Sequence, residues 1–163
     1  MKDRLIKMTK ARWWHRSSLG CLALESKAFW GYDAGFLQAC VDDLKVPWRT
    51  MLFGDVFIAA AGGCWRGFYA LEYADDQAEL THLFVHPQHI GQGVGTILWL
   101  HAVARVRTRM LRTCSETTLN IHSDPHARGF YERMGAVFAG EAASAVKPGR
   151  KLPYLKYQVA GGQ

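Results

Sequence analysis

The first third of the chain has apolar residues at helical spacing. One helix is predicted around residues 22–28, and a second begins after Asp33, whose side chain can cap it. Pro47 would end the second helix. Within it, apolar positions recur every three or four residues, at Phe36, Leu37, Cys40, Val41 and Leu44. Residues 1–54 are therefore predicted to form a helical region.

The pattern changes at residue 55, where short apolar segments alternate with turn residues. Strands are predicted at residues 55–61, 66–73 and 78–86. Gly62-Gly63 and Asp75-Asp76 are turn signals between them. Because strands joined by such short turns pair antiparallel, this segment is predicted to be an antiparallel meander.

Beyond the meander, a glycine-rich loop at residues 89–95 precedes a long apolar helix. The remaining pattern predicts a strand, a short helix and two final strands, at residues 117–122, 125–134, 136–142 and 152–159. Gly135 stands where a helix C-terminal cap is expected. This order predicts an α/β (α+β) fold with a mixed, mostly antiparallel central sheet and helices on both faces. The 163 residues are predicted to form one domain, helical over residues 1–54 and sheet-based over residues 55–163.

Composition and charge narrow the classes of ligand. Hydrophobic residues make up 49% of the chain, as in ordinary globular proteins, and no apolar run is long enough to span a bilayer. The charged N-terminal start lacks a signal-peptide stretch, so a cytoplasmic location is expected. The net charge of +6 favours anionic ligands, either a phosphorylated cofactor or nucleic acid. No CxxC pair exists, so no metal site is predicted, and free thiols are expected at Cys21, Cys40, Cys64 and Cys114.

The glycine loop, His89-Ile90-Gly91-Gln92-Gly93-Val94-Gly95, follows a predicted strand and opens a predicted helix. Backbone N–H groups of such a loop and the helix N-terminus favour an anion, and glycine lets a phosphate approach closely. The spacing is neither that of a P-loop nor the Gly-x-Gly-x-x-Gly of a dinucleotide fold. The loop therefore predicts a phosphate site of another class, with a purely structural turn as the alternative, because turns also need glycine.

The surrounding residues identify that class by resemblance. Residues 78–87, Ala-Glu-Leu-Thr-His-Leu-Phe-Val-His-Pro, with the glycine loop after them, resemble motif A of the GNAT N-acetyltransferase superfamily. Residues 124–136 resemble its motif B, in the family's order and spacing, and the resemblance covers residues 56–159. It implies a GNAT-like fold and an enzyme that moves an acetyl group from acetyl-CoA directly to a primary amine of a small molecule or protein. Two residues depart from the family pattern, Ile90 and Asp124.

The resemblance also implies where the donor binds. The pantetheine would pair with the backbone of a splayed strand at Leu83, Phe84 and Val85. The pyrophosphate would lie on the loop and helix start, at Ile90, Gly91, Gln92, Gly93, Val94, Gly95 and Thr96. Asp124 would also contact the cofactor, although an N-cap of the following helix is an equally good interpretation.

The same resemblance assigns catalytic candidates. Glu79 is the first candidate for the general base and His82 the second, each with an ordinary structural role as the alternative. Simple strand alternation would place Glu79 and Leu83 on one face and His82 on the other. The N–H of Leu83 would stabilise charge on the thioester oxygen. Tyr131, as a phenol near its usual pKa of about 10, would protonate the leaving thiolate; core packing is its alternative.

The acceptor site is predicted at the junction of the first two helices. Trp30 and Tyr32 could form an apolar or cation-binding wall, and Asp33 could pair with an amine. For each single residue, a turn that packs the helices onto the sheet is the favoured alternative. Arg150 could bind an anionic acceptor or face solvent. Two other functions stay open, a non-catalytic acyl-CoA sensor or scaffold and acetylation of aminoacyl-tRNA through the basic surface. Dispersed charge disfavours nucleic acid, no membrane partner is expected, and a homodimer is one option.

Overall fold

The computed structural model describes residues 5–110, 112 and 116–160. These residues form a seven-stranded sheet in the order β1-β2-β3-β4-β5-β7-β6. Only β4 and β5 pair parallel; the other neighbours pair antiparallel. The strands are β1 (Lys7–Lys10), β2 (Asp55–Ala61), β3 (Cys64–Ala74), β4 (Gln77–Val85), β5 (Glu116–His122), β6 (Val137–Ala143) and β7 (Lys151–Ala160).

The predicted meander is confirmed as β2, β3 and β4. Gly62 and Gly63 have φ of 59° and 77°, the left-handed conformation that a tight hairpin turn of this kind needs. The strand missed by the sequence pattern is β1, which pairs with β2 at the edge of the sheet. Its four residues are mostly exposed, so they show no apolar alternation.

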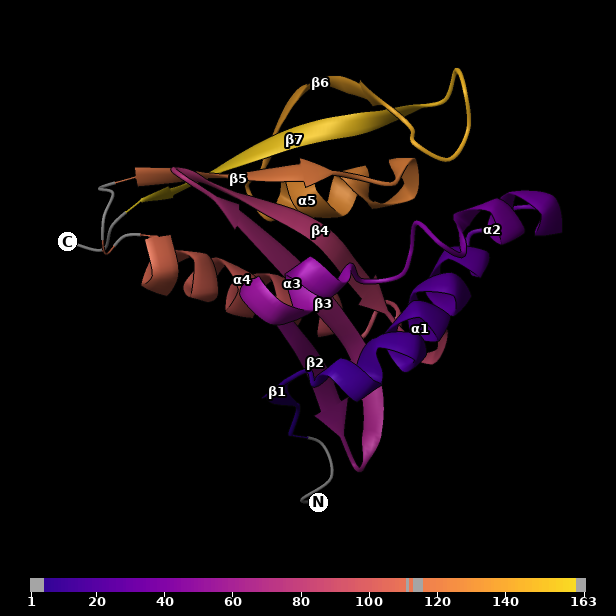
Figure 1. The fold of residues 1–163 in the computed structure, drawn as a ribbon, viewed down its shortest axis with the longest axis horizontal. Helices are drawn as coiled ribbons and strands as arrows, with labels where there is room; N and C mark the ends of the chain where they lie inside the picture. The colour runs from indigo at the N-terminus through magenta and orange to yellow at the C-terminus, as the bar shows by residue number, and fades with distance from the viewer. Residues whose placement is uncertain (1–4, 111, 113–115, 161–163) are drawn as a thin grey trace.

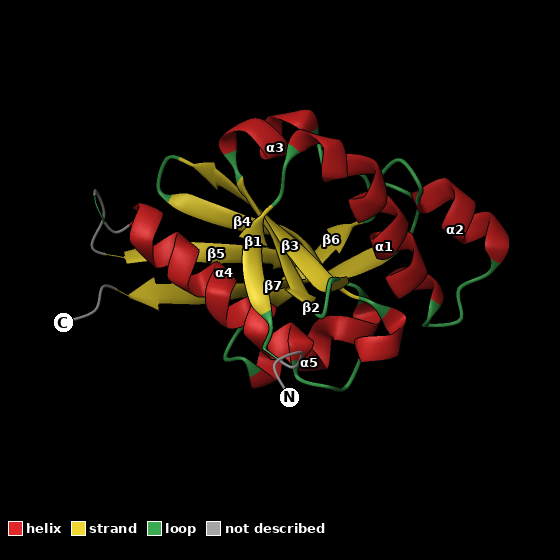
Figure 2. Cartoon of the chain, turned by 90° about the horizontal axis from the view of Figure 1, so that it is seen from below, coloured by secondary structure: helices red, strands yellow, loops and turns green. Residues whose placement is uncertain are grey.

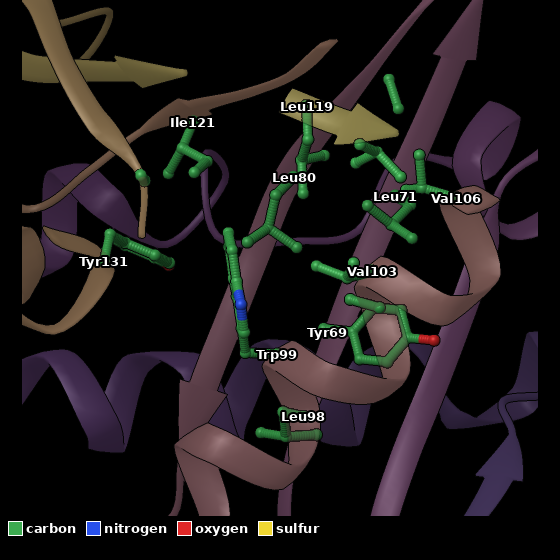
Figure 3. Packing of buried hydrophobic residues seen from close by; sticks show 14 of the residues in the cluster. Tyr69, Leu71, Leu80, Leu98, Trp99, Val103, Val106, Leu119, Ile121 and Tyr131 are labelled. Carbon is green, nitrogen blue, oxygen red and sulfur yellow. The ribbon is translucent and has the colours of Figure 1, made fainter. Parts of the chain in front are cut away.

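Helices cover both faces of the sheet, as predicted (Figure 2). One core lies between the sheet and the helices α4 and α5; it contains Trp99, Leu98, Tyr69 and Leu80 (Figure 3). The second lies under α1 and contains Leu19, with Phe68 from the opposite face of β3. The helices are α1 (Arg16–Ala28), α2 (Ala34–Cys40), α3 (Trp48–Phe53), α4 (Val94–Met110) and α5 (Arg128–Arg133).

The helix predicted from Asp33 to Pro47 is shorter than expected. Asp33 does cap α2, because its carboxylate accepts a hydrogen bond from the Phe36 amide at 2.9 Å. The helix nevertheless ends at Cys40, and turns follow it. Pro47 does not simply end a helix: it is the N-cap of α3, a short helix that the pattern did not predict.

A β-bulge in β4 breaks the predicted strand alternation. His82 pairs with Ala70 and Leu80 with Leu71, so Thr81 is the extra residue. Leu80 and Leu83 consequently pack on the same core, on the α4 side of the sheet. The prediction that Glu79 shares a face with Leu83 is therefore wrong: Glu79 points to the opposite face, the side of His82.

The parallel strands β4 and β5 separate after a short paired segment. Their pairing ends at Leu80 and Ile121, whereas β4 continues to Val85. Figure 1 shows the two strands diverging toward the end where α1 lies. Beyond Leu80, no strand of the described chain pairs with the β5 side of β4, so its backbone is available to an extended ligand.

Two further expectations concern cysteines and membranes. Cys21, Cys40 and Cys64 are free thiols, and Cys114 lies outside the described residues. Within the part of the chain that the structure describes, no helix is long and apolar enough to cross a membrane.

Candidate active site

A cavity of about 470 Å³ lies where β4 and β5 diverge. It brings together most of the predicted site residues, from the strand, the loop and both helical regions: Leu83, Phe84, Val85, Ile90, Gly91, Gly93, Gly95, Thr96, Asp124, Tyr131 and Trp30. The remaining predicted residues lie outside its wall: Glu79, Gln92, Val94, Tyr32 and Asp33. The cavity thus joins both motifs to the N-terminal helices.

The glycine loop presents backbone to this cavity. Gly91 and Gly93 have φ of 78° and 82°, and apart from the adjoining residues no atom of the described chain lies within 4 Å of the position of a Cβ on either. Gly95 differs, because a Cβ there would lie 3.3 Å from Phe130 Cε2, so its missing side chain lets α4 approach α5. The first amides of α4 lack intrahelical partners. Loop and helix start can therefore hold a phosphate group of the cofactor.

The two loop residues outside the cavity wall shape the loop. The Gln92 side chain donates to the carbonyl of Gln88 at 2.8 Å, which closes the turn. Val94 is buried in the core at the start of α4. Ile90 contributes an apolar side of the cavity where the family pattern has a polar residue.

Tyr131 lies on α5 with its ring against Trp99, their centroids 5.8 Å apart (Figure 3). Its hydroxyl has no hydrogen-bond partner among the described residues, and the residue lines the cavity. Burial, and then the charge of Asp124, raise the pKa of Tyr131 far above the usual value that the sequence suggested. The phenol therefore stays protonated and can donate a hydrogen bond into the cavity.

Asp124 is at the centre of a charged cluster. Its carboxylate accepts hydrogen bonds from Lys27 Nζ at 2.8 Å and from Tyr32 Oη at 2.9 Å. It also caps the turn that follows, through the His126 amide at 3.0 Å, and lies 3.6 Å from Arg150 Nη2. Burial alone would raise the pKa of Asp124, but the hydrogen bond and charge of Lys27, with the other donors, hold it below its usual value. The carboxylate is ionised, and its donors come from the protein.

Glu79 forms a pair that the sequence did not reveal. Its Oε1 accepts a hydrogen bond from His122 Nδ1 at 3.0 Å, and His122 lines the cavity at the end of β5. The His122 ring stacks on Tyr154, with centroids 5.0 Å apart and planes at 23°. In a neutral imidazole whose Nδ1 donates to the carboxylate, Nε2 is an acceptor. The pair is an acid–base candidate at the cavity.

The other base candidate, His82, is structural. It is buried and its Nε2 lies 3.2 Å from the carbonyl of Leu44. Burial lowers the pKa of His82 to about 4. The alternative interpretation of His82, a satisfied core histidine, is the one that this environment favours.

The predicted acceptor residues separate into different roles. Trp30 lines the cavity and stacks on His126, with ring centroids 5.0 Å apart and planes at 7°. Tyr32 instead donates to Asp124, and burial raises the pKa of Tyr32 to about 12. Asp33 is exposed and engaged as the cap of α2. The structure therefore does not bring Asp33 to the cavity, since its carboxylate serves a helix terminus.

Comparison with known proteins points to one family. The model of the acetyltransferase (GNAT) domain matches residues 53–135, which include the meander, the glycine loop and α5. No curated protein sequence matches the chain.

Solved structures agree on the fold. The chain is similar to the PaiA N-acetyltransferase from Thermoplasma acidophilum, solved with coenzyme A, at 16% identity and a TM-score of 0.69, covering 96% of this chain and 99% of that one. It is similar to the ribosomal-protein-S18-alanine N-acetyltransferase from Escherichia coli at 16% identity and a TM-score of 0.68, covering 98% of this chain and 97% of that one. The chain is also similar to a GCN5-related N-acetyltransferase from Rhodopseudomonas palustris, at 18% identity and a TM-score of 0.71, covering 98% of both chains.

Proposed function

Because the chain belongs to the GNAT acetyltransferase family, whose acyl donor is acetyl-CoA, we propose that it moves the acetyl group directly to a primary amine. The observation that supports this most is the cavity itself. It joins an open glycine loop, an edge of β4 and a buried phenol, and neither that edge nor the phenol hydroxyl has a partner among the described residues. These are the groups needed to hold the phosphates, the pantetheine and the leaving sulfur.

The proposed chemistry divides proton transfers between two sides of the cavity. The amine nitrogen attacks the thioester carbonyl carbon, the C–N bond forms and the C–S bond breaks. His122 Nε2 accepts the amine proton, while Glu79 holds the ring through Nδ1. Tyr131 Oη gives its proton to the leaving thiolate, and the Leu83 N–H stabilises charge on the carbonyl oxygen. In this proposal Glu79 is a positioning residue and His122 the base.

The first experiment is a calorimetric titration of the protein with acetyl-CoA and with CoA. Gly91→Ala should weaken binding of both, because it adds a methyl group in the space left for phosphate and strains a positive φ. Gly63→Ala is the matched control: its φ is 77° and its surroundings are equally open, so it carries the same backbone strain of about 1–2 kcal/mol. If neither ligand binds the wild-type protein, the donor site is wrong.

Release of CoA thiol with a panel of amines then tests the chemistry. Tyr131→Phe should lower kcat about 100-fold at little change in KM for acetyl-CoA. Tyr73→Phe is the matched control, since the Tyr73 hydroxyl donates to Asp55 away from the cavity. An unchanged kcat and pH profile in Tyr131→Phe would remove the acid role.

The base is identified by the acidic limb of the kcat/KM profile. His122→Gln should remove this limb, whereas Glu79→Gln should lower kcat but keep it, because Glu79 only orients the ring. The opposite result, loss of the limb in Glu79→Gln alone, would make Glu79 itself the base. Retention of the limb in both variants would exclude the pair.

A cytoplasmic location and a small-molecule or protein acceptor are part of the proposal. The RNA-directed alternative predicts binding that weakens steeply with salt. Flat binding of tRNA between low and high salt would remove it.

A further inference from the structure

Two clusters in this protein have the same composition: one aspartate, two cations and one tyrosine hydroxyl. In the first, Asp55 accepts hydrogen bonds from Tyr73 and Arg105 and lies 3.9 Å from Arg109 Nη1. In the second, Asp124 accepts from Tyr32 and Lys27 and lies 3.6 Å from Arg150. Each cluster has two positive charges and one negative charge, so each has one positive charge in excess.

The clusters differ in where that excess charge lies. The side chains of Arg105 and Arg109 are 36% and 41% exposed, so water solvates them. Those of Lys27 and Arg150 are only 11% and 18% exposed. In the part of the chain that the structure describes, Asp124 is the one carboxylate that contacts either cation. A largely buried positive charge in excess of its counter-ion is costly, and a bound anion would remove that cost.

Aromatic rings hold the two cations in place. Arg150 lies over the ring of Phe36, with its Cζ 4.6 Å from the centroid, and Lys27 Nζ lies 5.0 Å from the centroid of Tyr32. The Tyr32 hydroxyl also accepts a hydrogen bond from Arg150 at 2.9 Å. The positions of the charges are therefore largely fixed before a ligand arrives, which reduces the entropy cost of binding.

The cluster borders the reaction cavity. Lys27 and Asp124 both line it, and the charge of Asp124 reaches the Tyr131 phenol. The phosphates of the donor have their own site on the glycine loop. A single excess charge also matches one carboxylate better than a phosphate dianion.

We propose that Lys27, which lines the cavity, forms a carboxylate subsite with Arg150 behind it as a positioning residue outside the cavity wall, and that the acceptor is an amine that carries a carboxylate group. This rests on the proposed function, because the acceptor amine must reach the same cavity. Lys27 contacts the carboxylate of the acceptor directly, through the N–H groups of its ammonium that do not donate to Asp124. Because Arg150 also pairs with Asp124, the single negative charge of Asp124 does not fully neutralise Lys27.

Matched ligands test the subsite without requiring turnover. L-Amino acids, each paired with its carboxamide, are titrated by calorimetry into the free protein and into the CoA-saturated protein. We expect at least one acid to bind about 10- to 100-fold more tightly than its amide, the range for a charge-assisted hydrogen bond. If no acid of the panel binds more tightly than its amide, the subsite is wrong.

Arg150→Gln should reduce the acid-to-amide ratio to near unity and leave CoA affinity unchanged. Lys151→Gln is the matched control, because it removes the neighbouring, exposed positive charge and should keep the ratio. If Arg150→Gln weakened the binding of CoA as much as it weakened the binding of the acids, the cations would belong to the donor site and the proposal would be overturned. Failure of CoA to bind the wild-type protein would instead count against the proposed function, and the acid–amide comparison on the free protein would still test the subsite.

Discussion

The Asp55 and Asp124 clusters contain the same kinds of side chain, but their surroundings differ. Asp55 starts β2 and contacts two arginines of α4, so its cluster joins a strand to the helix packed on it. Asp124 follows β5 and contacts residues of α1 and of the β6–β7 connection. Among the described residues, Asp124 lines the cavity between β4 and β5, whereas Asp55 is not part of its wall. The comparison indicates that solvent access, more than composition, decides whether such a cluster stabilises the fold or is available to a ligand.

The largest expected effect is on stability at Asp55. Its side chain is 1% exposed, and Asp55→Asn leaves both arginines without their carboxylate. We expect a loss of about 3 kcal/mol in the free energy of unfolding, the lower end for a broken buried pair, because the arginines reach water. Urea denaturation measures it, with Asp42→Asn at an exposed pair as the control that should show no change. CoA affinity should stay normal; a weaker affinity would link this cluster to the site and break the comparison.

The next effect is at Asp124, where stability and chemistry should change together. Asp124→Asn should cost about 2 kcal/mol, between the values for surface and buried pairs. Burial is the main reason for the raised pKa of Tyr131, and the charge of Asp124 adds to it. Removing that charge should lower the pKa of Tyr131 and make the phenol a stronger acid, so the loss of kcat caused by Tyr131→Phe should differ between the Asp124→Asn protein and the wild type. An equal loss in both proteins would show that the cluster does not act on the phenol.

Features that depend on local sequence could be predicted, whereas features that depend on the whole fold could not. The meander and the glycine loop depend on turn residues and on backbone conformation, which neighbouring residues determine. Gly62, Gly63, Gly91 and Gly93 all have positive φ, and their positions in the sequence were sufficient to place the hairpin and the loop. The proposed donor side of the site follows from the sequence for this reason, because it is made mainly of backbone.

The proposed acceptor side could not be predicted in the same way. Lys27 and Asp124 are separated by 97 residues, and Tyr32 and Arg150 by 118. Nothing local marks Lys27 or His122 as part of a cavity. The extra residue at Thr81 is also invisible in an apolar pattern, although it decides which face Glu79 occupies. Side-chain clusters made from distant segments depend on the fold as a whole.

Acid should weaken both clusters. Despite burial, which acts in the opposite direction, hydrogen bonds and cations hold the pKa of Asp55 and Asp124 below the usual 3.8. A carboxyl with a lowered folded-state pKa stabilises the protein fully above its unfolded pKa, and the stabilisation is lost as pH falls through the folded pKa. Unfolding free energy should therefore fall below about pH 4, by up to about 1.4 kcal/mol per pH unit for each group. Denaturant melts of wild type and Asp55→Asn at pH 3 and pH 6 check this: the variant should lose less stability on acidification.

The smallest expected effect on stability is at a third aspartate, Asp33, which belongs to neither cluster. Asp33 contacts no cation among the described residues, and its carboxylate accepts only the Phe36 amide at the start of α2. Asp33→Ala should cost about 1 kcal/mol, the usual value of an N-cap, while Asp33→Asn should cost less, because asparagine also caps helices. Neither variant should change the KM of an amine acceptor, since Asp33 is outside the cavity wall. A raised KM in both variants, with stability unchanged, would place Asp33 in the acceptor site after all and would show that a carboxylate there needs no cation partner to take part in binding.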